Sequence, residues 1–282
     1  MSIGNNHFRT EMNSPILIAM NMTATELRKP VVAVQRAVQI LRYLGGSQRP
    51  VGVNEVARAL DIVPSTCQHI LKTLDYDGLV SEDKVAKKYQ LGPTLLRFAR
   101  DMVGSNDFVR NAQGVLDRIA QVHQVTTVAV WREGTDRIIV VAKANAPTNF
   151  SIHVNIGSRF PALTSAIGHC FAAAADLDPD YLREPFEELN WQNPPDFDAW
   201  LNDVAFAREN GYAVDTGQHI GGVTVVAAAI HEAVSNGVSG STRAIGGVGL
   251  SEQLKGKGLN ALAQDLKSSA AALSELYSES LV

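Results

Sequence analysis

The spacing of apolar positions predicts three short helices in the first part of the chain. Apolar residues recur at three- and four-residue steps in 31–44, which Gly45-Gly46 ends, and again in 53–60 and 64–75. Asn54 is a good N-cap for the second helix, and Pro64 suits the first turn of the third. The inward stripe of the third helix consists of Cys67, Ile70, Leu71 and Leu74. Two helices joined by the tight connection 61–63 predict a helix-turn-helix.

A strand pair with a basic tip follows these helices. Residues 79–82 and 89–92 have strand character, and 83–88 between them carries three lysines. A hairpin directly after a helix-turn-helix predicts its winged version. Residues 93–123 are helical nearly throughout, with a break near 104–107 where Asp107 can cap a second helix, and we expect this segment to connect two domains.

Beyond residue 124 the pattern mixes strands with helices, which predicts an α+β domain. The expected strands are 125–131, 137–144, 150–156, 212–214, 223–230 and 244–250. The expected helices are 165–175, 198–210 and 258–278, with a polar, proline-rich stretch over 176–198 and a loop of small residues over 235–242. Residues 1–29 show no sustained period, and we interpret them as a flexible arm.

Composition and charge narrow the class of protein. The chain has 282 residues, 45% hydrophobic and 19% charged, enough for two cores. No apolar run of membrane-spanning length occurs, so no membrane partner is expected. Cys67 and Cys170 form neither a disulfide framework nor a zinc cluster, which fits a reducing cytoplasm. The net charge is −4, yet residues 1–100 carry 13 Lys and Arg against 8 Asp and Glu. This basic first third suggests a polyanion partner; chance scatter over two solvated surfaces is the alternative.

The outward face of the third predicted helix is the candidate DNA reader. A helix fits the major groove, where Gln68 can bind adenine and Lys72 can bind guanine or a phosphate. An ordinary polar helix face is the alternative. The candidate DNA-binding residues are Arg36, Ser65, Thr66, Gln68, His69, Lys72, Lys84, Lys87 and Lys88.

Several ordered stretches resemble the IclR-type transcriptional regulators. In the first part these stretches are 33–41 (AVQRAVQIL), 54–57 (NEVA), 64–74 (PSTCQHILKTL), 78–80 (GLV) and 89–92 (YQLG). In the second part they are 157–168 (GSRFPALTSAIG) and 208–215 (RENGYAVD). The resemblance covers about residues 30–280.

The resemblance implies a fold, partners and a mode of action. It implies an α+β protein with a winged helix-turn-helix domain over 30–92, a helical linker over 93–123, and a GAF-like effector-binding domain with a central antiparallel sheet over 124–282. It implies homodimers or dimers of dimers that bind double-stranded operator DNA and respond to a small molecule, with no cofactor and no metal. An aromatic or branched organic acid is the effector we expect.

The effector site is carried over position by position, with Trp131, Phe160 and His219 added as candidate walls that ordinary packing also explains. The candidates are Trp131, Phe160, Thr164, Ser165, Ala166, Ile167, Asp215, His219, Val225, Gly246 and Val248. The chain departs from the family pattern at five positions. His69 replaces an arginine, Gln218 a glutamate, Val225 a cysteine, and Gly246 and Val248 two serines. Fewer hydroxyl groups predict a more apolar pocket.

Enzymatic chemistry lacks support in the motifs. Gly237 to Ser241 has the wrong spacing for a nucleophile elbow, and His231-Glu232 lacks the second histidine of a zinc protease. Cys170 beside His169 lies in an alanine-rich helix, where a buried inert thiol is the commoner case. We expect no enzyme activity. The rival function is a DNA reader whose second domain serves only oligomerisation or protein interaction.

Overall fold

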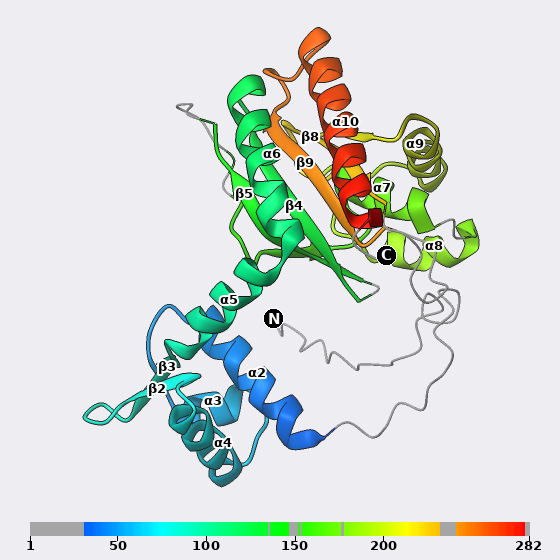
Figure 1. Ribbon diagram of the computed structural model, residues 1–282. Helices are drawn as coiled ribbons and strands as arrows, with labels where there is room; N and C mark the ends of the chain where they lie inside the picture. The colour runs from blue at the N-terminus through cyan, green and yellow to red at the C-terminus, as the bar shows by residue number, and fades with distance from the viewer. Residues whose placement is uncertain are drawn as a thin grey trace. The chain divides into compact units, whose positions relative to one another are not determined.

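The computed structural model describes residues 31–134, 136–146, 152, 154–175, 178–231 and 241–279 (Figure 1). The chain forms two compact units, one ending at Asp107 and the other beginning at Phe108. The predicted arm, 1–29, lies outside the described residues, as do residues 235–240 of the predicted small-residue loop. None of the helices in the described ranges is long and apolar enough to cross a membrane.

The N-terminal unit is the predicted winged helix-turn-helix. Its elements are α2 (Val32–Gly46), β1 (Val51–Gly52), α3 (Val53–Ala59), α4 (Pro64–Tyr76), β2 (Val80–Asp83), β3 (Lys88–Leu91) and α5 (Thr94–Ser105). The strands form an antiparallel sheet in the order β1-β3-β2. Three helices and the sheet enclose one core, in which Ile40, Cys67, Leu71 and Tyr89 are almost fully buried.

The expected cap of α3 is wrong by two residues. Asn54 lies inside the helix, and Gly52 occupies the N-cap position without a side-chain bond. The reason is tertiary, because Val51 and Gly52 pair with Tyr89 and Lys88 of β3. The chain therefore passes from strand to helix before it reaches Asn54.

The base of the wing depends on a glycine. Gly92 donates to Leu79 O (2.9 Å), and a Cβ at Gly92 would lie only 2.2 Å from Gly78 O. A side chain at this position would push the two strand ends apart. Burial, and then Glu82, raise the pKa of Tyr89, which is the buried residue of β3, to about 12.

The C-terminal unit is built on a six-stranded antiparallel sheet, as the predicted fold class requires. Its strands are β4 (Thr126–Glu133), β5 (Arg137–Ala144), β6 (Arg159–Pro161), β7 (Ala213–Thr216), β8 (Val223–Ile230) and β9 (Arg243–Leu250). Their order across the sheet is β6-β5-β4-β9-β8-β7. Its helices are α6 (Asp107–His123), α7 (Ser165–Ala175), α8 (Pro179–Glu187), α9 (Phe197–Asn210) and α10 (Lys257–Glu279).

Helices cover the sheet on two faces (Figure 1). On one face α6 and α10 share a core with the sheet, to which α6 contributes Phe108, Leu116 and Ile119. On the other face α7 packs through Ala166 and Phe171, and α8 and α9 close over it around Trp200. The second half of the segment expected to connect the domains is thus part of this unit's core.

Two expectations for this unit are wrong. Residues 152 and 154–156 of the expected strand 150–156 lie outside any strand, and the edge strand is β6 at 159–161 instead. The proline-rich stretch 176–198 contains the helix α8. Asp178 caps α8 by accepting from Asp180 N (3.0 Å), and Leu182 and Phe186 bury one face. Polar composition concealed a capped helix that is stabilised by packing.

Candidate nucleic-acid interface and ligand cavity

The outward face of α4 carries an exposed polar stripe. Ser65, Gln68, His69 and Lys72 are exposed, whereas Cys67, Leu71 and Leu74 on the opposite side are buried. Thr66 is half-buried at the margin of the stripe. Steps of three and four residues place the exposed side chains on one side of the helix.

Tyr76 extends this stripe and was missed by the sequence analysis. It is 91% exposed and lies four residues after Lys72 and seven after His69, at the last position of α4. The interpretation of 75–78 as a helix end hid it. The seven-residue spacing from His69 was the signal that could have found it.

The wing tip has an ordered turn that exposes its lysines. Asp83 Oδ1 accepts bonds from Val85 N (2.9 Å) and Ala86 N (3.0 Å). These bonds, the one from Ala86 first, lower the pKa of Asp83. Lys84, Lys87 and Lys88 are exposed around this turn. Lys87 Nζ lies 4.0 Å from Glu82 Oε1, which is a weak surface pair.

A groove between the wing and the start of α3 adds two arginines that the sequence analysis did not single out. Its lining includes Arg49 and Arg58 together with Lys87 and Lys88. Arg49 forms a two-pronged pair with Glu55, with N–O distances of 2.7 and 3.2 Å. The remaining candidate, Arg36, is half-buried on α2.

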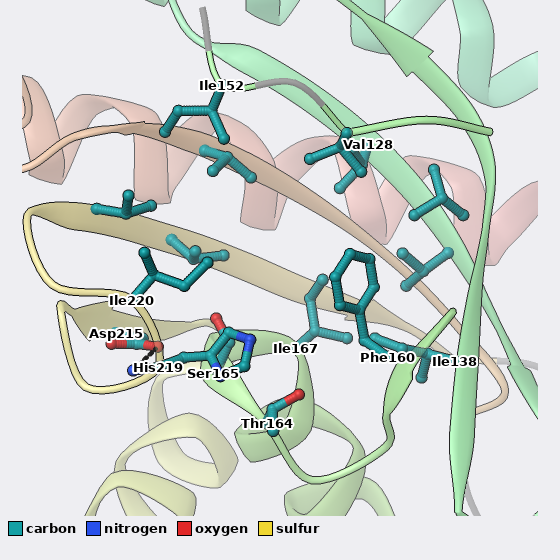
Figure 2. A pocket seen from close by; sticks show the side chains of 16 residues that line it. Val128, Ile138, Ile152, Phe160, Thr164, Ser165, Ile167, Asp215, His219 and Ile220 are labelled. Carbon is teal, nitrogen blue, oxygen red and sulfur yellow. Dashed lines mark hydrogen bonds between the residues drawn. The ribbon is translucent and has the colours of Figure 1, made fainter. Parts of the chain in front are cut away.

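The C-terminal unit contains a cavity on the α7 side of the sheet (Figure 2). Its empty space is about 640 Å³, counted to its open mouth. Most of the wall is aliphatic. The lining residues are Val128, Val130, Ile138, Val140, Ile152, Val154, Phe160, Thr164, Ser165, Ile167, Asp215, His219, Ile220, Val223, Val225 and Val248.

The polar residues of the cavity gather at one end, as Figure 2 shows. Ser165 is 7% exposed with φ 64°, and its Oγ is buried without a hydrogen-bond partner. Thr164 Oγ1, in contrast, donates to Pro161 O (2.8 Å). Ser165 begins α7, so the first N–H groups of the helix lie at this end.

Asp215 and His219 complete the polar end. The Asp215 carboxylate is 1% exposed and accepts from Gln218 N (2.7 Å) and His219 N (3.3 Å). His219 Nδ1 is buried without a partner, and the His219 ring meets the Trp191 ring edge-on at 6.2 Å. Burial lowers the pKa of His219, and the Asp215 charge opposes that effect. The imidazole is therefore neutral at pH 7.

A strap holds the loop that carries His219. Gln192 N donates to His219 O (3.3 Å), and Asn193 N donates to Gln218 O (3.0 Å). Gly221 N donates in turn to Gln192 Oε1 (2.7 Å). The mouth of the cavity is thus formed by two segments that are about 25 residues apart in sequence.

The structure brings together eight of the eleven candidates for the effector site. Trp131, Ala166 and Gly246 do not line the cavity. Trp131 packs on the α6 and α10 face, with the Arg243 guanidinium 4.9 Å from its ring centre. Alternation along β4 explains this, since Val128 and Val130 face the cavity.

The other two corrections have different causes. Ala166 is fully buried within the core beneath α7. At Gly246 a Cβ would lie 3.1 Å from Val226 O and 3.8 Å from Ile167 Cδ1, so this position lies underneath a lining residue. The sequence analysis missed the aliphatic wall from β4 and β5, although the two-residue spacing of Val128 with Val130 and of Ile138 with Val140 was a visible signal.

The candidate thiol nucleophile proves inert. Cys170 is buried, and burial raises its pKa to about 12. Its Sγ lies 3.4 Å from Ala227 O. The neighbouring His169 is fully buried against Trp200, with ring centres 5.8 Å apart, and burial lowers its pKa. A neutral thiol beside a neutral imidazole cannot supply a thiolate at pH 7.

Comparison with known domain families decides the family. The IclR helix-turn-helix domain matches residues 33–84, and the C-terminal domain of the bacterial transcriptional regulator IclR matches residues 100–275. The chain belongs to the IclR family. It is thus an IclR-type DNA-binding transcriptional regulator with an effector-binding C-terminal domain, and this family is not enzymatic.

Characterised relatives of this IclR-family chain are regulators. The glycerol operon regulatory protein of Streptomyces coelicolor is 26% identical over 223 residues, which cover 73% of this chain and 81% of the relative. The transcriptional repressor AllR of Escherichia coli is 24% identical over 215 residues, which cover 75% of this chain and 79% of AllR.

Solved structures agree on the fold. An IclR regulator from Alicyclobacillus acidocaldarius matches with a TM-score of 0.76 and 27% identity, covering 87% of this chain and 98% of that one. An IclR homologue from Microbacterium hydrocarbonoxydans, complexed with 4-hydroxybenzoate, matches with a TM-score of 0.68 and 18% identity, covering 86% and 98%.

Proposed function

We propose that this regulator reads operator DNA through the outward face of α4 and the wing, and that a small molecule in the cavity changes that binding. The observation that best supports the DNA part is the exposed stripe of Gln68, His69 and Lys72 on a helix whose other side is buried. Those side chains project from the surface of a helix that fits a major groove.

The basic groups divide into two proposed roles. Gln68 reads a base edge, with Ser65, Thr66, His69 and Lys72 around it. Phosphates are the proposed contacts of the remaining candidates, Arg36, Lys84, Lys87 and Lys88, and of the groove residues Arg49 and Arg58. His69, in place of the family's arginine, reaches less far and is mostly neutral at pH 7, so we propose a weaker contact there.

Two copies of the chain are proposed to bind one near-palindromic site. Both α2 and α5 expose apolar side chains, which supports self-association of the N-terminal unit; they are Val34, Val38, Leu96, Phe98 and Met102. Two-fold symmetry would then place one α4 in each half-site. Light scattering of the full chain, with and without DNA, separates a dimer from a dimer of dimers. We place this activity in the bacterial cytoplasm, where operator DNA is found.

The effector is proposed to be a small organic acid with a branched or aromatic body. The aliphatic wall suits the body, and the unpartnered Ser165 Oγ and the first N–H groups of α7 suit a polar end. The Microbacterium homologue, which is complexed with an aromatic acid, makes 4-hydroxybenzoate a sensible first probe.

Duplex binding by the full chain tests this function. Fluorescence anisotropy compares a duplex from the promoter region of its own gene with a random duplex of equal length, at low salt and at about 0.15 M salt. We expect tight, salt-dependent binding of the first duplex that the effector alters. Equal weak binding of both duplexes contradicts the proposal. Thermal shifts with organic acids test the cavity, since a ligand of the native state raises Tm. The absence of any shift would favour a pure oligomerisation or interaction module.

A further inference from the structure

The cavity wall presents one carboxylate and no cation. Among the described lining residues, Asp215 carries a formal charge and none is Lys or Arg. Two nearby cations are engaged elsewhere. Lys143 on β5 donates from Nζ to Val154 O (2.9 Å), and Arg159 on β6 lies 2.6 Å from Glu133.

The other titratable groups around the polar end supply no positive charge. His169 on α7 is fully buried, and burial lowers its pKa although Asp203 and Asp215 oppose that effect. Asp203 on α9 adds a carboxylate and accepts from Gln218 Nε2 (3.0 Å). His219 is neutral at pH 7, as described above. The start of α7 contributes only the partial charge of a helix N-terminus.

A carboxylate ligand at this end would therefore lie beside Asp215 with no counter-ion and little water. Two carboxylates that share a site cannot both remain ionised without a large cost, and one of them takes up a proton. An uncharged polar group meets no such cost. Each Asp215 oxygen accepts one backbone N–H and retains a lone pair for a ligand donor. Ser165 Oγ and His219 Nδ1 are available as further partners.

We propose that the cavity admits its ligand without added net charge, so that a carboxylic acid binds together with one proton and a neutral isostere binds without one. This inference rests on the proposed function, because it specifies the form in which the effector enters. It also names a second ligand class, the amides, alcohols and phenols with a small branched or aromatic body.

Matched pairs of compounds test the inference on the full chain. The probes are benzoate with benzamide, and 3-methylbutanoate with 3-methylbutanamide. Isothermal titration at pH 6, 7 and 8, in two buffers of different ionisation enthalpy, gives Kd and the number of protons taken up. We expect the Kd of each acid to rise by about tenfold per pH unit, with one proton taken up per acid bound. The Kd of each amide should stay constant.

Two substitutions locate the effect. Asp215→Asn removes the charge, so the acids should bind at pH 8 nearly as tightly as at pH 6. Lys143→Met removes the cation that a competing account would use, and we expect acid binding to be unchanged in it. Circular dichroism checks that Asp215→Asn is folded, and the wild-type pH series decides the question if it is not.

Three results would overturn the inference. One is an acid Kd that is the same at pH 6 and pH 8 with no proton uptake. Another is loss of acid binding in Lys143→Met. The third is binding of none of the four compounds while duplex binding persists. The first two leave the proposed function intact, whereas the third also removes its effector class.

Discussion

At the scale of single residues, neighbouring side chains on α4 and the wing have different proposed tasks. Gln68 lies on the exposed face of a helix, where its amide can form a bidentate contact with adenine. Lys87 lies on the wing as a point charge suited to a phosphate. Specificity and overall affinity should therefore respond to different substitutions.

Gln68→Ala should cost about 1–3 kcal/mol at one operator base pair and leave random DNA unaffected. Lys87→Ala should weaken binding to every sequence and reduce the salt slope by roughly one unit. Anisotropy over a set of single-base operator variants and salt concentrations measures both effects. Gln121→Ala and Lys257→Ala, at exposed sites in the C-terminal unit, are the matched controls. Equal effects of the two substitutions on operator and random DNA would argue against separate roles.

Asp265 shows how one residue links two helices. Its carboxylate lies 2.7 Å from Arg118 Nη2 and 2.9 Å from His123 Nε2, so it ties α10 to both the middle and the end of α6. Arg118 first, and then His123, lower the pKa of Asp265 to about 2. Because the folded-state pKa lies below the ordinary value of 3.8, this stabilisation is present above about pH 4. It is lost as the pH falls through about 2.

Asp265→Asn should therefore lower the free energy of unfolding at pH 7. We expect a loss of about 1–2 kcal/mol, after allowance for the half-exposed Arg118, and a difference from wild type that shrinks between pH 4 and pH 2. All three tryptophans lie in the C-terminal unit, so fluorescence during urea unfolding reports on that unit. Glu209→Gln, at an exposed site on α9, is the control. A difference that does not change with pH would show that the pairing is not electrostatic.

At the scale of elements, α7 is positioned by a close approach. A Cβ at Gly168 would lie 2.1 Å from the backbone carbon of Leu163, so the turn before α7 can come this near only because position 168 has no side chain. That turn also holds Thr164 and Ser165 at the polar end of the cavity. Glycine here is a requirement of packing, whereas Gly114 in the middle of α6 has open space around it.

Two glycine substitutions should therefore have opposite signs. Gly168→Ala should destabilise the C-terminal unit by at least about 2 kcal/mol, because backbone must move. Gly114→Ala should stabilise it by about 0.5–1 kcal/mol through helix propensity. Urea unfolding followed by fluorescence measures both variants. Stabilisation of the unit by Gly168→Ala would show that the turn before α7 is looser than described.

The elements themselves were predictable where one local period persists. The stripe of α4 and the bounds of α7 followed from their sequence patterns. The register of β5 did not. Ala129 pairs with Ala142 whereas Val130 pairs with Val140, so Val141 is an extra residue that interrupts alternation. Both Val141 and Ala142 then belong to the core on the α6 side. A bulge of this kind depends on pairing with another strand.

At the scale of the whole molecule, the two units must exchange free energy for a ligand to regulate DNA binding. A ligand shifts the balance between two arrangements only by its difference in affinity for them. The coupling is reciprocal for the two binding equilibria. No single contact needs to be known for this reciprocity to hold.

The reciprocity can be measured on the full chain. If an acid changes operator affinity by some factor, within the usual range of about 5–150, saturation with operator should change the affinity for that acid by the same factor. Anisotropy gives the first factor and isothermal titration gives the second, with a random duplex as the control. Unequal factors would mean that the acid acts at more than one site or changes the state of assembly.

The amino-acid sequence by itself determined the winged helix-turn-helix, its polar outward face and the mixed second domain. Each depends on local periodicity, which backbone geometry imposes over a few residues. Only the tertiary structure decided the cavity. Strand β4 lies beside β9 in the sheet, so Val128 and Val248 share one wall although 120 positions separate them. A single glycine-free turn of strand or helix carries no record of such partners, because burial on a given face depends on elements that arrive from elsewhere in the chain.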